Sequence, residues 1–162
     1  RVKFGLPLSE AFKDNVIPVQ LLDMLIYIAR DGVTTTDLFR RPGNPTDTKN
    51  ILKKMADGRD VEYSNYNFYT LASVIKKFLL KIPGGIFGIE AENQLLQVLN
   101  INEKLLQFDA INKIIRSLPE CTQHLISLLF GTWFRMAHHS DHNSMSSESV
   151  AKSVAGSLFH TC

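Results

Sequence analysis

The sequence predicts an all-α protein, a single-domain helical bundle, and three observations support this fold class. Apolar residues recur at helical spacing along most of the chain, proline and glycine separate these stretches, and no segment shows the alternation expected of a β-strand. The 162 residues are 44% hydrophobic and 21% charged, which suits one globular domain with one core. We therefore expect residues 1–162 to form a single domain, and we expect that domain to be part of a longer multidomain protein.

Two helices are predicted in the first third of the chain. Residues 17–32 contain Pro18 in the opening turn, where a missing N–H is tolerated, and an apolar stripe follows. The stripe consists of Leu21, Leu22, Leu25, Ile28 and Ala29. A second helix, over about residues 45–58, begins with Asn44 as a side-chain cap and Pro45 in the first turn. A polar loop over residues 59–67 separates it from the next helix.

The clearest helical pattern covers residues 68–82. Its apolar residues fall at positions i, i+3, i+4, i+7, i+8 and i+11, which is the spacing of a core-facing stripe. They are Leu71, Val74, Ile75, Phe78, Leu79 and Ile82. Lys76, Lys77 and Lys81 lie off this stripe, and Pro83 ends the helix. We expect the ring of Phe78 to be buried and the lysines to face solvent.

Four more helices are predicted in the second half of the chain, over residues 91–99, 103–117, 121–138 and from 147 onward. The third of these places an apolar stripe on one face, and the fourth does the same with smaller residues. The stripe of the helix at residues 121–138 consists of Leu125, Leu128, Leu129, Trp133 and Met136. The stripe of the helix from residue 147 onward consists of Val150, Ala151, Val154, Ala155 and Leu158. We expect Trp133 to be largely buried.

Composition excludes several classes of function. A formal net charge of +2 does not indicate nucleic-acid binding. The sequence contains no run of 18 apolar residues, so it predicts no membrane span. Cys121 and Cys162 stand in unrelated contexts, so we expect no disulfide framework and a reducing, cytoplasmic location. The chain has no glycine-rich phosphate loop followed by lysine and no assignable Ser/His/Asp arrangement.

Two clusters allow alternative interpretations. His138 and His142 could share a helical face and bind a metal, but no further ligands are evident, and a polar helix end is the better interpretation. Tyr63, Tyr66 and Tyr69 could stack on bases, but no basic residues are interleaved with them. We therefore expect the tyrosines to pack a loop onto the bundle.

The segment DLFRRPGNPTD, residues 37–47, sets Arg40 and Arg41 on or just before a loop. On these residues alone, the pair is either a solvated basic patch or includes one arginine that is held out for a function.

Four stretches, in order along the chain, resemble the motifs of the RhoGAP domain. They are FGLPL at residues 4–8, DLFRRPGN at 37–44, VIKKFLLKIP at 74–83 and NSMSSESVAKSVAGSL at 143–158. The resemblance implies an all-helical module that stimulates GTP hydrolysis by Rho-family small GTPases.

In this resemblance, Arg40 matches the arginine finger and Arg41 falls at a variable position of the same loop. Lys76 matches a lysine that fixes the finger loop and the GTPase contact, and Asn143 matches the first asparagine of the closing motif. The resemblance implies that Arg41, Lys76 and Asn143 belong to the surface that binds the GTPase. The implied partner is a Rho-family GTPase, which brings its own GTP and magnesium. The resemblance thus implies a monomeric domain with no cofactor, no metal and no independent active site.

The sequence also departs from the family pattern. Thr36 and Asp37 replace the usual Glu-Gly, and Asp37 brings a negative charge toward a phosphate-rich site. Leu80 stands in place of an arginine, and Ser149 in place of an asparagine, at positions that contact the GTPase. These departures predict weak stimulation. The alternative is a weak or inactive module that binds a small GTPase or another signalling protein.

Overall fold

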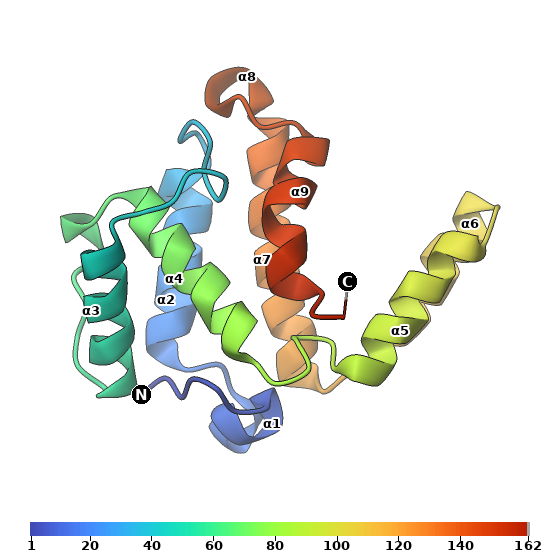
Figure 1. Cartoon of the computed structure of the whole chain (residues 1–162), viewed down its shortest axis with the longest axis horizontal. Helices are drawn as coiled ribbons and strands as arrows, with labels where there is room; N and C mark the ends of the chain where they lie inside the picture. Colours follow the sequence, from blue (N-terminus) through green and yellow to red (C-terminus); the bar gives the residue numbers. More distant parts are fainter. Residues whose placement is uncertain (162) are drawn as a thin grey trace.

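The computed structural model describes residues 1–161, and every regular element within that range is helical (Figure 1). The α-helices are α1 (Leu8–Ala11), α2 (Val19–Tyr27), α3 (Pro45–Ala56), α4 (Phe68–Lys81), α5 (Ile89–Gln97), α6 (Lys104–Arg116), α7 (Glu120–His138), α8 (Ser140–Asn143) and α9 (Ser147–Leu158). Short 3₁₀ turns follow at Lys13–Asn15, Tyr63–Asn65 and Val98–Asn100, and a π-helical turn, Ile28–Gly32, extends α2. None of the helices in this range is long and apolar enough to cross a membrane.

Helix α4 lies inside the bundle, where it packs against α3 on one side and α9 on the other. Helix α7 packs against α9 and α2, so the helices share one core. Phe78 on α4 is 2% exposed and stacks on Phe12, with ring centroids 6.2 Å apart. Trp133 on α7 is 4% exposed. Both predictions of burial are therefore confirmed. The rings are buried because each belongs to an apolar stripe at helical spacing.

Side-chain caps mark the starts of three helices. Asn44 accepts a hydrogen bond from the backbone N–H of Asp47 at 3.0 Å, which confirms the predicted start of α3. Asn67 and Ser146 cap α4 and α9 in the same way. The predicted start of the first long helix was wrong, because Pro18 has extended backbone angles and α2 begins after it, at Val19. Pro18 therefore occupies the N-cap position just before the first turn of α2.

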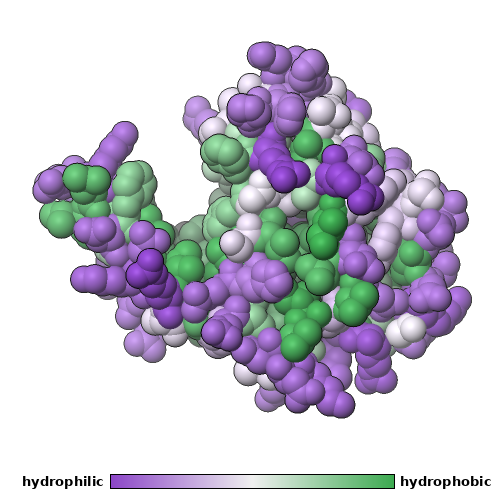
Figure 2. Space-filling view, turned by 180° about the vertical axis from the view of Figure 1, so that it is seen from behind, coloured by the Kyte–Doolittle hydropathy of each residue, from purple (hydrophilic) through white to green (hydrophobic). Residues whose placement is uncertain are grey.

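The hairpin formed by α5 and α6 projects from one side of the bundle (Figure 1). Helix α6 has no fully buried residue, and the arm exposes large apolar side chains at Leu99, Leu105, Leu106 and Phe108. The view from behind shows this hydrophobic surface on the arm at left (Figure 2). The predicted helices are present here, but their apolar stripes are only partly covered.

Candidate functional site

Residues 33–44 form the loop that carries Arg40, called the finger loop below. It leads from the π-helical turn after α2 to α3 and lies at the top of the bundle, beside α8 (Figure 1). Leu38 and Phe39 point into the core, and the Phe39 ring meets the edge of Trp133 with centroids 6.0 Å apart. Arg40 follows directly, with its side chain 49% exposed. Burial of the two preceding side chains therefore fixes the backbone from which an exposed guanidinium projects.

Two side chains of α4 hold this loop by its carbonyl groups. The ammonium group of Lys76 donates to the carbonyl oxygen of Phe39 at 3.0 Å, one residue before Arg40. Burial lowers the pKa of Lys76 from its ordinary value. The hydroxyl of Tyr69 donates to the carbonyl oxygen of Thr36 at 2.6 Å. Lys76 therefore lies beside Arg40, and its ammonium group is used on the loop. The expectation that all three lysines of this helix face solvent was wrong for Lys76, which is half-buried.

The far end of the loop lies in direct contact with the α4 backbone. Gly43 donates its N–H to the hydroxyl of Ser73 at 3.0 Å, and Asn44 donates to the hydroxyl of Thr70 at 3.1 Å. A Cβ atom added to Gly43 would lie 2.3 Å from the Cα of Thr70. Only glycine fits this approach, because any larger residue would push the loop away from the helix.

Asp37 begins the finger loop in a backbone conformation that favours glycine. Its φ angle is +59°, and its N–H donates to the carbonyl oxygen of Asn143 at 3.0 Å. Its own carbonyl accepts the N–H groups of Arg40 and Arg41 at 3.0 and 2.9 Å. Aspartate tolerates left-handed angles better than most residues, at a cost of about 1 kcal/mol. The substitution of Asp37 for glycine is thus accommodated within the loop.

Both arginines of the loop form ion pairs with the carboxylate of Asp37. Arg40 is bonded to one carboxylate oxygen, and Arg41 lies 3.4 Å from the other. The Arg41 guanidinium also lies over the Tyr69 ring, 5.1 Å from its centroid. Arg40, Arg41, Lys76 and Lys77 together line a hollow of about 180 Å³, so four residues that carry positive charge meet at one small depression.

Asn143 requires a correction to the expected set of contact residues. The residue is 0% exposed, so it cannot touch a partner directly. Its amide nitrogen donates to the carbonyl oxygens of Val33 and Met136 at 2.8 and 2.6 Å. Its amide oxygen accepts the N–H of Met145 at 2.8 Å. Asn143 therefore ties the start of the finger loop to α7 and to the segment before α9.

The two substituted contact positions, Leu80 and Ser149, lie on different helices. Leu80 is exposed near the end of α4. Ser149 is half-buried in the first turn of α9, where its hydroxyl lies 3.1 Å from that of Ser146. Leu80 therefore presents an apolar side chain, and the Ser149 hydroxyl is already engaged within the helix cap.

The histidine cluster does not share one helical face, so that part of the alternative interpretation was wrong. Helix α7 ends at His138, and His142 lies in the separate helix α8. Within residues 1–161, no group of three or more His, Cys, Asp or Glu side chains could hold a metal.

The tyrosines do pack loops onto the bundle, since Tyr63 donates to the carbonyl oxygen of Gln20 at 2.7 Å and Tyr69 bonds the finger loop.

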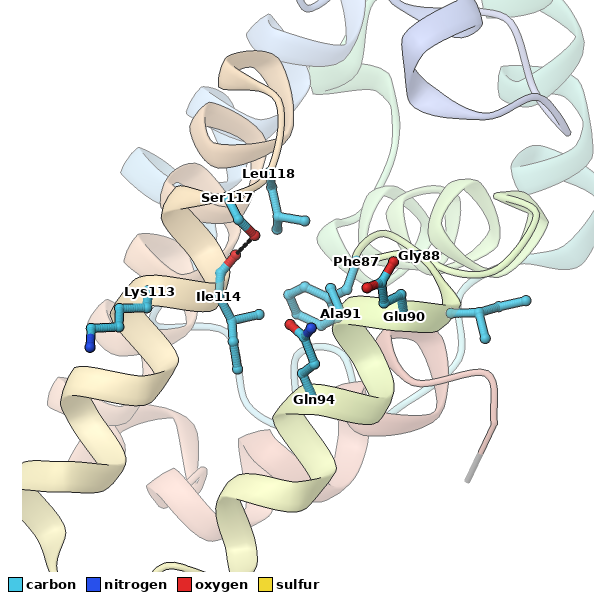
Figure 3. Close-up of a pocket in the computed structure, with 10 residues that line it drawn as sticks. Phe87, Gly88, Glu90, Ala91, Gln94, Lys113, Ile114, Ser117 and Leu118 are labelled. Carbon is cyan, nitrogen blue, oxygen red and sulfur yellow. Dashed lines mark hydrogen bonds between the residues drawn. The ribbon is translucent and has the colours of Figure 1, made fainter.

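A larger hollow, of about 550 Å³, lies at the root of the arm between α5 and α6. Its lining includes Phe87, Ala91, Gln94, Ile114 and Leu118. Gln94, Ile114 and Leu118 point into the space between the helices, whereas Lys113 points away from it (Figure 3). This hollow includes no residue of the finger loop, so it is separate from the site around Arg40.

Three features of this site were not predicted from the sequence: the Asp37 ion pairs, the close approach of Gly43, and the bond from Tyr69. The spacing of Asp37 from Arg40 and Arg41 by three and four residues was a signal for the ion pairs. The Gly43 and Tyr69 contacts join residues 26 or more positions apart. No local pattern could have indicated them.

The fold indicates a class of protein, and comparison with known proteins identifies its family. The RhoGAP domain model matches residues 18–162, so the chain belongs to the RhoGAP family. The resemblance found in the four motifs is therefore confirmed.

Among curated relatives, the chain is similar to human Rho GTPase-activating protein 20, with 27% identity over 155 residues, which cover 96% of this chain and 13% of the relative. It is 27% identical to human Rho GTPase-activating protein 1 over 92% of this chain and 35% of that protein. Human unconventional myosin-IXa is 24% identical over 92% of this chain and 6% of its own length. The chain thus spans a small part, about a third at most, of these relatives.

Solved structures show the same fold. Human Rho GTPase activating protein 15 superposes with a TM-score of 0.91 at 16% identity, over 98% of this chain and 78% of that chain. The BH domain from GRAF, the GTPase regulator associated with focal adhesion kinase, gives a TM-score of 0.79 at 16% identity, over 86% and 76% of the two chains.

Proposed function

We propose that this domain binds a Rho-family small GTPase and accelerates GTP hydrolysis by supplying Arg40 in trans. The observation that carries the proposal is the placement of Arg40, an exposed guanidinium on a loop fixed by the buried Phe39 and by the Lys76 bond. Membership of the RhoGAP family supports the partner class.

The chemistry explains why an arginine is suited to this role. The transition state of phosphoryl transfer spreads negative charge over phosphate oxygens, and a guanidinium is always charged and offers several donors in a fixed fork. An arginine supplied in trans contributes roughly 10³ to 10⁵ in rate. GTP and magnesium come with the partner, so this domain needs no independent active site.

The neighbouring cations support the same role. Arg41, Lys76 and Lys77 line the hollow beside Arg40, and these positive charges outnumber the single Asp37 carboxylate, so the local potential favours an anionic partner surface. Lys76 acts through the loop, because its ammonium group already donates to the Phe39 carbonyl. Arg41 and Lys77 remain exposed and are available to contact the GTPase.

A second candidate function is binding with weak or no activation, and three positions favour it. Leu80 offers no donor at an exposed site on α4. Ser149 has a short side chain whose hydroxyl lies against the helix cap. Asp37 places a carboxylate on the finger itself. These positions weaken an interface without removing the finger.

A panel of Rho-, Rac- and Cdc-type GTPases separates the two functions. Single-turnover GTP hydrolysis is measured with and without the domain, and binding is measured on the same proteins loaded with a non-hydrolysable GTP analogue. The proposal expects at least one GTPase that both binds and hydrolyses GTP faster. Binding without faster hydrolysis by any member would support the second function instead. An absence of both binding and stimulation across the panel would contradict both.

A further inference from the structure

The Asp37 carboxylate lies between two guanidinium groups near the start of the finger loop. It is ion-paired with Arg40, and Arg41 lies 3.4 Å from its second oxygen. The Asp37 side chain is 21% exposed and that of Arg40 is 49% exposed, so the pair is partly shielded from water. Shielding strengthens an ion pair relative to one in open solvent.

Hydrogen bonds fix the backbone of Asp37 in place. The N–H of Asp37 is bonded to the carbonyl oxygen of Asn143, which belongs to a buried residue. The carbonyl of Asp37 accepts the N–H groups of both arginines. Because hydrogen bonds hold the aspartate backbone at three points, the pair separates through side-chain rotation, and rotation of Arg40 is the movement that carries its guanidinium to a partner's phosphate.

Arg41 determines what happens to the carboxylate after that rotation. Its guanidinium is held over the Tyr69 ring and hydrogen-bonded to the Tyr69 hydroxyl at 3.4 Å. It already lies within ion-pair distance of Asp37. When Arg40 leaves, the carboxylate thus keeps a cationic partner, so release of Arg40 leaves no unpaired buried charge.

We propose that Asp37 is a positioning residue that holds Arg40 in a latched state in the free domain, and that phosphate groups of the bound partner must break this latch. The inference rests on the proposed function of Arg40. The guanidinium donors used on the carboxylate are those that a phosphate oxygen would require. The latch therefore lowers the maximal rate of stimulated hydrolysis and leaves the affinity for the partner largely unchanged, since the ion pair breaks only when Arg40 reaches the phosphates.

Asp37→Asn tests the latch, because asparagine has the same shape, accepts left-handed backbone angles and carries no charge. We expect the single-turnover rate at saturating domain to rise about two- to five-fold, the range that partly exposed ion pairs contribute. The domain concentration for half-maximal rate should change less than about two-fold, since the ion pair is present both in the free domain and in the bound ground state and is broken only on the way to the transition state. Higher salt should raise the parent rate at saturation relative to that of the variant, because salt screens the ion pair.

Two control variants distinguish the latch from other effects. Asp31→Asn removes an equal charge from the exposed Arg30–Asp31 pair, whose atoms lie 3.4 Å apart, and should give no gain. Asp37→Asn in an Arg40→Ala background should also give no gain. Thermal unfolding of each variant reports whether the fold is retained.

The outcomes separate this inference from the proposed function. A gain that depends on Arg40 supports the latch. An unchanged or lower rate for a folded Asp37→Asn variant overturns the latch and leaves the finger proposal intact. An equal gain in the Arg40→Ala background also overturns the latch, because the charge would then act without the finger. If Arg40→Ala alone leaves stimulation unchanged, the proposed function fails, and the latch fails with it.

Discussion

Gly43 offers the sharpest structural perturbation of the finger loop. In Gly43→Ala the new Cβ would lie 2.3 Å from the Cα and 2.4 Å from the N of Thr70, both backbone atoms of α4. Ordinary contact begins near 3.4 Å, so the loop must retreat from the helix by about 1 Å. The bond from the Gly43 N–H to the hydroxyl of Ser73 would lengthen with it. Helix α4 cannot give way, because its opposite face lies in the core.

The expected magnitudes follow from this displacement. Overpacking of this kind costs about 1–3 kcal/mol, which corresponds to about 2–12 °C in Tm for a domain of this size. A misplacement of about 1 Å at a catalytic group lowers the rate by roughly 10²-fold. Thermal unfolding and single-turnover GTP hydrolysis on the responsive GTPase measure the two effects.

Gly131→Ala is the matched control. Gly131 lies inside α7 and is exposed, and an added Cβ would meet no atom within 4 Å. Alanine should stabilise this helix by about 0.5–1 kcal/mol and leave stimulation unchanged. A Gly43→Ala variant with the Tm and activity of the parent would refute the reasoning, because the loop would not depend on close contact with α4.

Three further predictions concern the supports of the site and the core. Asn143→Ala removes three buried hydrogen bonds. It should lower the free energy of unfolding, measured by urea titration, by about 2–4 kcal/mol. An unchanged stability would contradict the role of Asn143 in joining the finger loop to α7. Leu80→Arg combined with Ser149→Asn should raise stimulation by about ten- to a hundred-fold in single-turnover assays, and no gain in a folded variant would show that these positions do not limit activity. Burial raises the pKa of Glu92, but hydrogen bonds from Thr161 outweigh this effect and lower the pKa overall. The stability from ionised Glu92 is therefore present above its unfolded pKa of about 4.3 and is lost as the pH falls through the lower folded value. Urea unfolding at a series of pH values should show less acid destabilisation in Glu92→Gln than in the parent, and equal curves would contradict the assignment.

The long helices could be predicted because periodic stripes and caps are local signals. Phe78 and Trp133 are buried as their spacing indicated, and α3 begins at the Asn44 cap. The four-residue helices α1 and α8 were not predicted, since one turn is too short to show a period. The weakly covered stripe of α6 could not be foreseen either, because exposure depends on which helices pack against it.

At the site, the position of Arg40 on the loop could be predicted from the residues around it, but its surroundings could not. Asn143 was assigned to the contact surface because a sequence motif gives a residue's position along the chain but does not say whether its side chain is buried. Its burial results from contacts with Val33, 110 residues away. Asp37 was expected to bring a negative charge toward the site, but its ion pairs with Arg40 and Arg41 and its left-handed backbone angle were not foreseen.

The central claim is that Arg40 acts on the transition state of a partner's GTP hydrolysis. The most direct test measures Arg40→Ala beside the parent domain, both for binding to the responsive GTPase and for single-turnover hydrolysis. The account predicts that the stimulated rate falls by about 10³-fold or to the intrinsic rate, while the dissociation constant changes by less than about ten-fold. Arg116→Ala, at an exposed arginine at the end of α6, is the control and should match the parent in both measurements. Stimulation by Arg40→Ala equal to that of the parent would contradict the account.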